Sequence, residues 1–189
     1  MPRSAQFTQE EVINAAVQIV ESEGVEKLTA RSLGKKLGSS SRPIFTTFKS
    51  MEEVFDGVLN FAESLYQTYV RSGLLKPIAF KGVGESYIRF AEEHPKLFRL
   101  LFMRERAELP DPKSILGLIE ESYSIILNSI TENYSVDETF AKDLYFQMWI
   151  YSHGIAVLIV DKMCRFNETE ISDLLTNAFK SFLIGGRKK

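Results

Sequence analysis

The positively charged side chains of this sequence gather in one short stretch that also carries three consecutive serines. Residues 27–49 contain six basic residues and no aspartate or glutamate. The basic residues are Lys27, Arg31, Lys35, Lys36, Arg42 and Lys49. The formal net charge of the whole chain is -2, so the rest of the chain is strongly acidic. A basic face on an acidic protein is typical of a docking surface for a polyanion, although a solvated helix face would have the same composition.

Side chains that could bind a metal or act as nucleophiles are scarce. The chain has a single cysteine, Cys164, and two histidines, His94 and His153, which are far apart in sequence. One cysteine excludes an intrachain disulfide framework, and no histidine has an acidic residue at the spacing of a metal site. We therefore expect no metal and no other cofactor, and we predict that the protein is not an enzyme.

The composition fits an ordinary soluble protein. The 189 residues are 44% apolar and 12% aromatic, enough to build one large core or two small ones. The N-terminus lacks the apolar segment of a signal peptide, and the longest apolar run, GIAVLIV at 154–160, is too short to cross a membrane. These features predict no membrane contact and a cytoplasmic location.

Helical periodicity extends through nearly the whole chain, without a convincing two-residue alternation. The clearest helix covers about 8–23, because Thr8 and Glu11 form a capping box and Gly24 is a natural stop. Caps, glycines and prolines predict further helices at about 29–37, 40–48, 51–73, 78–93, 95–104, 112–133, 137–163 and 168–184. We thus predict an all-α fold of about nine helices.

Two features of these helices predict how the chain is organised. The helix at 137–163 is apolar on two sides, so it needs two packing partners, whereas the last helix has one apolar stripe and leaves Lys180 to water. We expect a first domain over 1–50, which continues into a linker helix at about 51–73, and a second domain over 75–189.

The two short helices have the spacing of a helix-turn-helix motif, with a turn at Gly38 and Ser39. In such a motif the second helix enters the major groove of DNA and the first crosses the backbone. Hydroxyls of the three serines, together with the helix N-terminus, suit a phosphate oxygen. Arg42 could contact a guanine edge, and Thr46 and Thr47 a thymine methyl group or a phosphate.

The order of these residues resembles the DNA-binding domain of tetracycline-repressor (TetR) family regulators. Over residues 8–61 the shared pattern is an amphipathic helix, G-x-x-x-L-T, K-K-L-G after a small residue, a serine-rich turn, aromatic-x-x-F and K-S-x-E-E. The resemblance implies backbone contacts from Thr29, Ser40, Phe45 and Lys49, and base contacts from Arg42, Pro43 and Thr47. Together the motif and the resemblance predict these DNA-binding residues: Thr29, Arg31, Ser39, Ser40, Ser41, Arg42, Pro43, Phe45, Thr46, Thr47 and Lys49.

Two positions depart from that family pattern. Phe45 stands where the family usually has a tyrosine, and Met51 where it usually has a lysine. Two phosphate contacts are therefore expected to be missing or replaced, for instance by Lys49.

The second half of the chain is similar to a TetR subgroup whose ligand domain carries a tryptophan and a His-Gly pair. The segments that carry this similarity are EEHPKLFRLLF at 92–102 and WIYSHG at 149–154. It implies a sensor without naming its ligand. Because a few aromatic side chains of a regulator usually line an apolar cavity, we expect a small, mostly apolar effector. The predicted ligand-binding residues are Phe61, Tyr87, Phe102, Tyr123, Trp149 and His153, although such aromatics usually form core and His153 could be a satisfied core or interface histidine.

These expectations combine into a DNA-binding transcriptional regulator. The last two helices of two chains would form a four-helix bundle, and the resulting homodimer would present its recognition helices to a near-palindromic double-stranded operator. An effector that binds better when the two DNA-binding domains are at another separation would release the repressor from its operator. The alternatives are a helical small-molecule-binding or interaction protein with no specific DNA target, and a helical-bundle enzyme.

Overall fold

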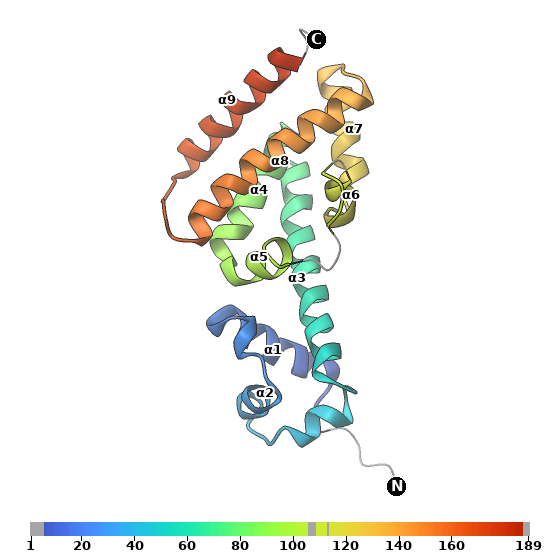
Figure 1. The fold of residues 1–189 in the computed structure, drawn as a ribbon, viewed down its shortest axis with the longest axis vertical. Helices are drawn as coiled ribbons and strands as arrows, with labels where there is room; N and C mark the ends of the chain where they lie inside the picture. The colour runs from blue at the N-terminus through green and yellow to red at the C-terminus, as the bar shows by residue number, and fades with distance from the viewer. Residues whose placement is uncertain (1–5, 106–108, 113, 187–189) are drawn as a thin grey trace. The chain divides into compact units, whose positions relative to one another are not determined.

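The computed structural model describes residues 6–105, 109–112 and 114–186. These residues form nine α-helices and two 3₁₀-helices without a β-strand, which confirms the predicted all-α fold. The α-helices are α1 (Gln9–Glu23), α2 (Ala30–Lys36), α3 (Met51–Leu74), α4 (Ala79–Glu93), α5 (Pro95–Phe102), α6 (Ile115–Ile119), α7 (Tyr123–Tyr134), α8 (Glu138–Val160) and α9 (Glu168–Gly186) (Figure 1). The 3₁₀-helices are η1 (Val25–Lys27) and η2 (Arg42–Thr46). None of the described helices combines the length and the apolar character needed to span a bilayer.

The chain divides into two compact units. The first comprises Met1–Leu65 and His94–Arg104, and the second comprises Tyr66–Glu93 and Glu105–Lys189. Helix α3 contributes residues to both units, in the region where the sequence places the linker helix. Segment 94–104, which the predicted boundary assigns to the second domain, belongs to the first unit because α5 packs against α1.

Local capping determines where α1 begins and ends, as predicted. The Thr8 hydroxyl accepts the Glu11 N–H at 3.1 Å, and the Glu11 carboxylate accepts the Thr8 N–H at 2.7 Å. Gly24 follows the helix with a φ of 101°, a value that glycine adopts without strain. The inward stripe of α1 is fully buried at Val12, Ala16 and Val20.

The sequence predicted helix α2 correctly but not the kind of helix in the segment that follows it. Thr29 caps α2 in a reciprocal pair with Ser32, and Ile44 and Phe48 are buried as their spacing predicts. The predicted α-helix over 40–48 is wrong, because only the 3₁₀-helix η2 forms there. Its hydrogen bonds join residues three apart, from the Ile44 N–H to the Ser41 carbonyl at 3.3 Å and from the Thr47 N–H to the Ile44 carbonyl at 3.0 Å.

In the second unit, α4 packs against α8 and α9, and α8 also contacts α7. Figure 1 shows α8 and α9 lying side by side. The core of the second unit includes the buried side chains of Ile88, Phe90, Leu144 and Leu175, and the Phe90 ring contacts Tyr66 and Tyr69 of α3. The apolar character of α8 on two sides is thus satisfied in part by α4 and in part by α9.

The predicted single helix over 112–133 is wrong, since α6 and α7 are separate helices. The chain is extended at Glu120, with φ -125° and ψ 104°. The Glu120 carboxylate accepts hydrogen bonds from the Ser122 N–H at 3.0 Å and from the Tyr66 hydroxyl at 2.7 Å. A side chain that bonds to nearby backbone competes with helical hydrogen bonds, so these contacts stabilise the break.

Gly34 provides a test of the packing between α2 and the turn. A Cβ atom at Gly34 would lie 2.8 Å from the carbonyl carbon of Ser40, which is backbone and cannot rotate away. We expect Gly34→Ala to lower the free energy of unfolding by about 1–3 kcal/mol, as overpacking does. Gly117→Ala is the control, because a Cβ there meets nothing within 4 Å and should be neutral or slightly stabilising. Equal urea midpoints for the two variants would contradict this close approach.

Candidate functional site

The first unit presents an open depression whose walls are basic and hydroxyl-bearing. It is lined by Arg31, Lys35, Gly38, Ser39, Ser40 and Ser41. Four of the predicted DNA-binding residues therefore come together, from the α2 helix and the turn that follows it. Such a combination of cations, hydroxyls and turn backbone suits a phosphate group.

Four further predicted DNA-binding residues are exposed to solvent, and they follow the lining residues of this depression in the sequence. Arg42, Thr46 and Lys49 are exposed, and the Phe45 ring is 46% exposed. The side chain of Lys49 is 93% exposed, with its ammonium 3.9 Å from Glu53. An aromatic ring left this open contributes little to the core and is available to a partner.

Hydroxyl groups at three predicted positions already have partners within the chain. The Thr47 hydroxyl donates to the carbonyl of Phe7 at 3.0 Å, and the Thr46 hydroxyl donates to the carbonyl of Pro43 at 2.6 Å. Thr29 uses its oxygen to cap α2. Thr47 and Pro43 are also only half-exposed. Since η2 is a five-residue 3₁₀-helix, the predicted help of a helix dipole to a bound phosphate is lost there.

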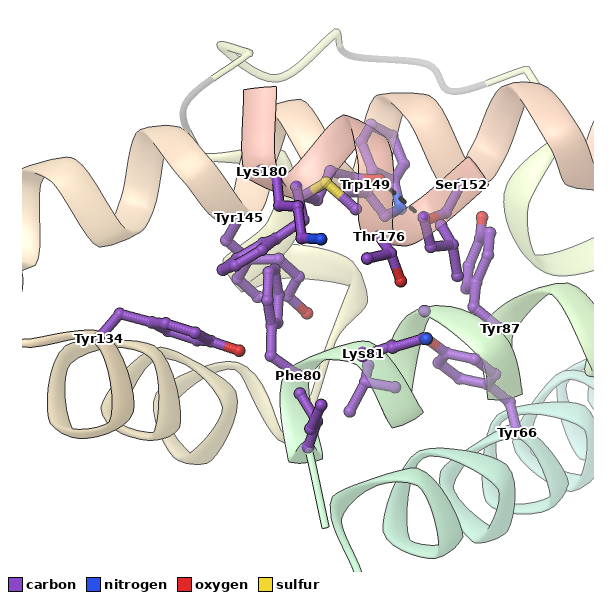
Figure 2. A pocket seen from close by; sticks show the side chains of 16 residues that line it. Tyr66, Phe80, Lys81, Tyr87, Tyr134, Tyr145, Trp149, Ser152, Thr176 and Lys180 are labelled. Atoms are coloured by element: carbon purple, nitrogen blue, oxygen red, sulfur yellow. Dashed lines mark hydrogen bonds between the residues drawn. The ribbon is translucent and has the colours of Figure 1, made fainter. Parts of the chain in front are cut away.

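The second unit contains a mostly apolar cavity with a volume of about 310 Å³. Its walls come from α3, α4, α7, α8 and α9 and consist largely of aromatic and aliphatic side chains (Figure 2). The lining residues are Tyr66, Ile78, Phe80, Lys81, Val83, Gly84, Tyr87, Tyr134, Tyr145, Met148, Trp149, Ser152, Leu175, Thr176, Phe179 and Lys180. An apolar cavity with a few polar groups has the composition of a small-molecule site.

Two of the six predicted ligand-binding residues, Tyr87 and Trp149, line this cavity. His153 lies next to both, because its Nδ1 is 2.8 Å from the Tyr87 hydroxyl and its ring stacks on Trp149 at 5.3 Å. Burial lowers the pKa of His153, which favours a neutral imidazole. Its contacts fit a satisfied histidine that positions two lining residues.

The other three predicted ligand-binding residues have no place in the cavity. Phe61 and Phe102 belong to the first unit, where Phe102 packs on Phe98 at a ring distance of 5.0 Å. Tyr123 stacks on Tyr145, one of the lining residues, at 5.7 Å. From sequence alone, core aromatics and cavity aromatics have the same helical spacing, so the pattern could not separate them.

Polar lining residues were not predicted from the sequence. Lys81, Ser152, Thr176 and Lys180 all border the cavity, and Lys180 does so although the periodicity of its helix leaves it to water. A long lysine side chain at the edge of an apolar stripe can cover apolar surface with its stem and still keep its ammonium near solvent. Only the position at the stripe edge could have indicated this.

A buried carboxyl group lies directly behind the cavity wall. Glu120 is 5% exposed and bonds to the hydroxyl of Tyr66, a lining residue, and to the Gln67 amide at 3.3 Å. Burial raises the pKa of Glu120, although these hydrogen bonds act in the opposite direction. Burial also raises the pKa of the Tyr66 phenol, with Glu120 adding to the rise. No sequence signal pointed to Glu120, because it falls within an otherwise helical pattern.

Within the described ranges, no cluster of three or more His, Cys, Asp or Glu side chains is arranged to hold a metal ion.

A family model and several curated relatives match parts of the chain. Residues 80–182 match the family model described as "Tetracyclin repressor-like, C-terminal domain". The nucleoid occlusion factor SlmA of Haemophilus ducreyi is 26% identical over 119 residues, which are 58% of this chain and 59% of that protein. The chain thus spans about half the length of the curated relatives that it matches.

Two solved structures share the fold over almost the whole chain. A protein of unknown function from Rhodococcus sp. RHA1 has a TM-score of 0.72 at 18% identity, with 98% of each chain covered. Thermus thermophilus FadR, a TetR-family transcriptional repressor in complex with lauroyl-CoA, has a TM-score of 0.58 at 15% identity, with 93% of each chain covered. At these identities the likeness concerns the fold.

The titration of Glu120 predicts a pH dependence of stability. Because its pKa is raised in the folded chain, the folded chain binds more protons than the unfolded chain, and the free energy of unfolding falls as the pH rises through this interval. Glu120→Gln keeps the shape and removes the titration. We expect the stability of the wild type relative to the variant to fall in urea unfolding as the pH rises above the usual titration range of a glutamate, until Glu120 is ionised in the folded chain as well. The control is Glu132→Gln at an exposed site, and the same pH profile for both variants would rule out a raised pKa at Glu120.

Proposed function

The chain belongs to the TetR-like family of transcriptional regulators, and we propose that it is a homodimeric repressor that a small molecule releases from a near-palindromic operator. This family consists of regulators rather than enzymes, in agreement with the sequence. The observation that carries the proposal is the basic and hydroxyl-rich depression over α2 and the turn after it, beside the exposed Arg42 and Phe45. A regulator with this role acts in the cytoplasm.

DNA binding is supported by the kinds of contact that this surface offers. Arg31, Lys35 and the three serines supply cations and hydroxyls for the phosphate backbone, which fix register and carry little sequence information. Arg42 is exposed at the start of η2 and can donate two hydrogen bonds to one guanine. We therefore assign affinity mainly to the depression and base preference mainly to Arg42.

Ligand responsiveness is supported by the cavity in the second unit. A volume of about 310 Å³ lies at the lower end of the usual range of small-molecule sites. FadR, which shares the fold, was solved with lauroyl-CoA, so this fold accommodates a ligand with an apolar chain in that protein. A ligand that binds better to the DNA-free conformation weakens DNA binding by its differential affinity, typically about 5- to 150-fold.

Dimer formation is supported by apolar surface on the last two helices. Ile150 on α8 is 50% exposed and Ile184 on α9 is 58% exposed, although both helices are otherwise well packed. Gly154, on the same helix as Ile150, is exposed, and a Cβ there would meet nothing within 4 Å. We propose that a second copy of the chain covers these faces, which would place two heads on one DNA duplex.

The DNA proposal is tested by selecting bound fragments from a random DNA library and measuring affinity for the selected site at several salt concentrations. Lys35→Ala should weaken binding to all sequences and reduce the slope of log K against log salt by about 1. Arg42→Ala should relax the preference at one base pair in each half-site, worth about 1–3 kcal/mol. Arg165→Ala, an exposed cation of the second unit, should change neither quantity. If no sequence is enriched, the chain is instead an interaction or ligand-binding protein.

The dimer proposal is tested by light scattering after size-exclusion chromatography. Ile150→Asp should shift the chain from dimer to monomer, because the interface would bury an unpaired carboxylate at a cost of several kcal/mol. Ile125→Asp is the matched control, since Ile125 on α7 is 61% exposed and lies on a helix outside the proposed interface. A wild-type chain that is monomeric at micromolar concentration would refute the proposal.

A further inference from the structure

Most hydroxyl groups around the cavity already use their hydrogen atoms within the protein. The Ser152 hydroxyl donates to the Met148 carbonyl at 2.9 Å, and the Thr176 hydroxyl donates to the Ser172 carbonyl at 2.7 Å. The Tyr66 hydroxyl donates to Glu120. These groups satisfy each other or their own helices, so they do not determine by themselves which ligand is held.

The indole N–H of Trp149 is buried and forms no hydrogen bond of standard geometry. Its nearest polar contact is the Tyr87 hydroxyl. Burial raises the pKa of that phenol, and the contact with Trp149 acts in the opposite direction. The donor is thus held only weakly by Tyr87, and an acceptor group of a ligand near α8 would give it a better partner.

Two lysines border the same cavity from different helices, Lys81 from α4 and Lys180 from α9 (Figure 2). The ammonium of Lys81 is 3.8 Å from Glu85, and Lys76 binds the same carboxylate more closely at 2.7 Å. Lys180 has no ion-pair partner among the residues that the structure describes. No aspartate or glutamate is among the lining residues. The cavity is thus bordered by a weakly held N–H donor and by two lysines, and by no carboxylate.

The remaining walls determine the body of the ligand. Phe80, Val83, Met148, Leu175 and Phe179 offer apolar contacts and no hydrogen-bonding groups. Burial of an apolar body here is favourable, whereas a second charged group in the ligand would be desolvated without a partner. The cavity therefore suits one apolar body and one acceptor-rich head.

We propose that the effector of this protein is a small organic anion, namely a carboxylate with an aromatic or short aliphatic body, whose head lies near Lys81 and Lys180. This inference rests on the proposed function in taking the cavity to be the effector site. It adds the sign of the ligand's charge, which neither the family nor the fold specifies. An anionic head is held by charge-assisted hydrogen bonds, which are stronger than neutral ones.

The test uses the full-length chain and compounds that differ only in the head group. Binding of octanoate, octanamide and octylamine, and of phenylacetate and phenylacetamide, is measured by isothermal titration calorimetry. We expect each carboxylate to bind about ten to a hundred times more tightly than its amide, and the amine not to bind detectably. Equal affinities for carboxylate and amide, or tighter binding of the amine, would overturn the inference.

Variants at the two lysines test whether the carboxylate of the ligand lies near Lys81 and Lys180. Lys180→Met and Lys81→Met keep an unbranched stem and remove the charge, so each should weaken the carboxylate about tenfold and leave the amide unchanged. Lys180→Arg should retain the preference for the carboxylate. The matched control is Lys142→Met, because Lys142 is paired with Glu138 at 2.6 Å and does not line the cavity. A double variant that still prefers the carboxylate would overturn the assignment, and thermal unfolding of the ligand-free variants shows whether each is folded.

The two proposals fail in different ways. If a DNA sequence is selected but no carboxylate binds, the anionic effector is wrong and the regulator function stands. If a carboxylate binds with the expected dependence on Lys180 but no DNA sequence is selected, the proposed function is wrong and the ligand class stands. If both hold, the carboxylate and not its amide should release the selected DNA.

Discussion

The packing of α4 against α8 and α9 organises the core of the second unit. It brings aromatic rings together at steep angles. The Phe80 ring meets the Tyr145 ring at 5.6 Å and 89°, and the Phe179 ring at 5.9 Å and 63°. Edge-to-face contacts of this kind are favourable and have a defined geometry. Phe80, Tyr145 and Phe179 all line the cavity, so the same contacts that join the helices also form its wall.

Helix α3 gives the two proposed activities a common element. Its first part belongs to the unit that carries the basic depression, and its last part supplies Tyr66 to the cavity wall. Gly73, near its end, would place a Cβ 2.5 Å from the carbonyl oxygen of Gly82, so α3 and α4 are in backbone contact there. In the proposed function, a ligand that contacts α4 and Tyr66 favours some positions of α3 over others. The coupling between the two sites is then limited by that difference in affinity.

How much the sequence predicts depends on how local each determinant is. The capping boxes at Thr8 and Thr29 and the inward pair Ile44 and Phe48 involve residues within one helical turn, so α1, α2 and the buried side of the turn follow from the pattern. The break at Glu120 does not follow, because its partner Tyr66 is 54 residues away in sequence. The exposed residues of the basic stretch at 27–49 were likewise predictable, from the charges of their side chains and from the order of the residues in the motif. The hydrogen bond from Thr47 to Phe7 was not, since it spans 40 residues.

The cavity illustrates the same limit for a functional site. Tyr87 and Trp149 were predicted because aromatics on helices of the second unit are natural lining residues, yet Phe61, Phe102 and Tyr123 matched that description equally well. What distinguishes the two groups is which helix each one faces, and a periodic pattern specifies only the inward side. Lys81 and Lys180 were missed for the converse reason, because a polar residue at the edge of an apolar stripe is normally assigned to solvent.

Glu120 gives the proposed anion site a further electrostatic consequence. The carboxyl group lies one side chain behind the cavity wall, and its charge also acts on Tyr87 and Tyr145, which line the cavity. An anionic head and an ionised Glu120 repel each other, so binding of the anion favours the protonated form of Glu120. By linkage, protonation of Glu120 favours binding of the anion to the same extent. The burial that raises the pKa of this residue thus lowers the repulsion that an anionic effector would meet, and the two features of the second unit are mutually consistent.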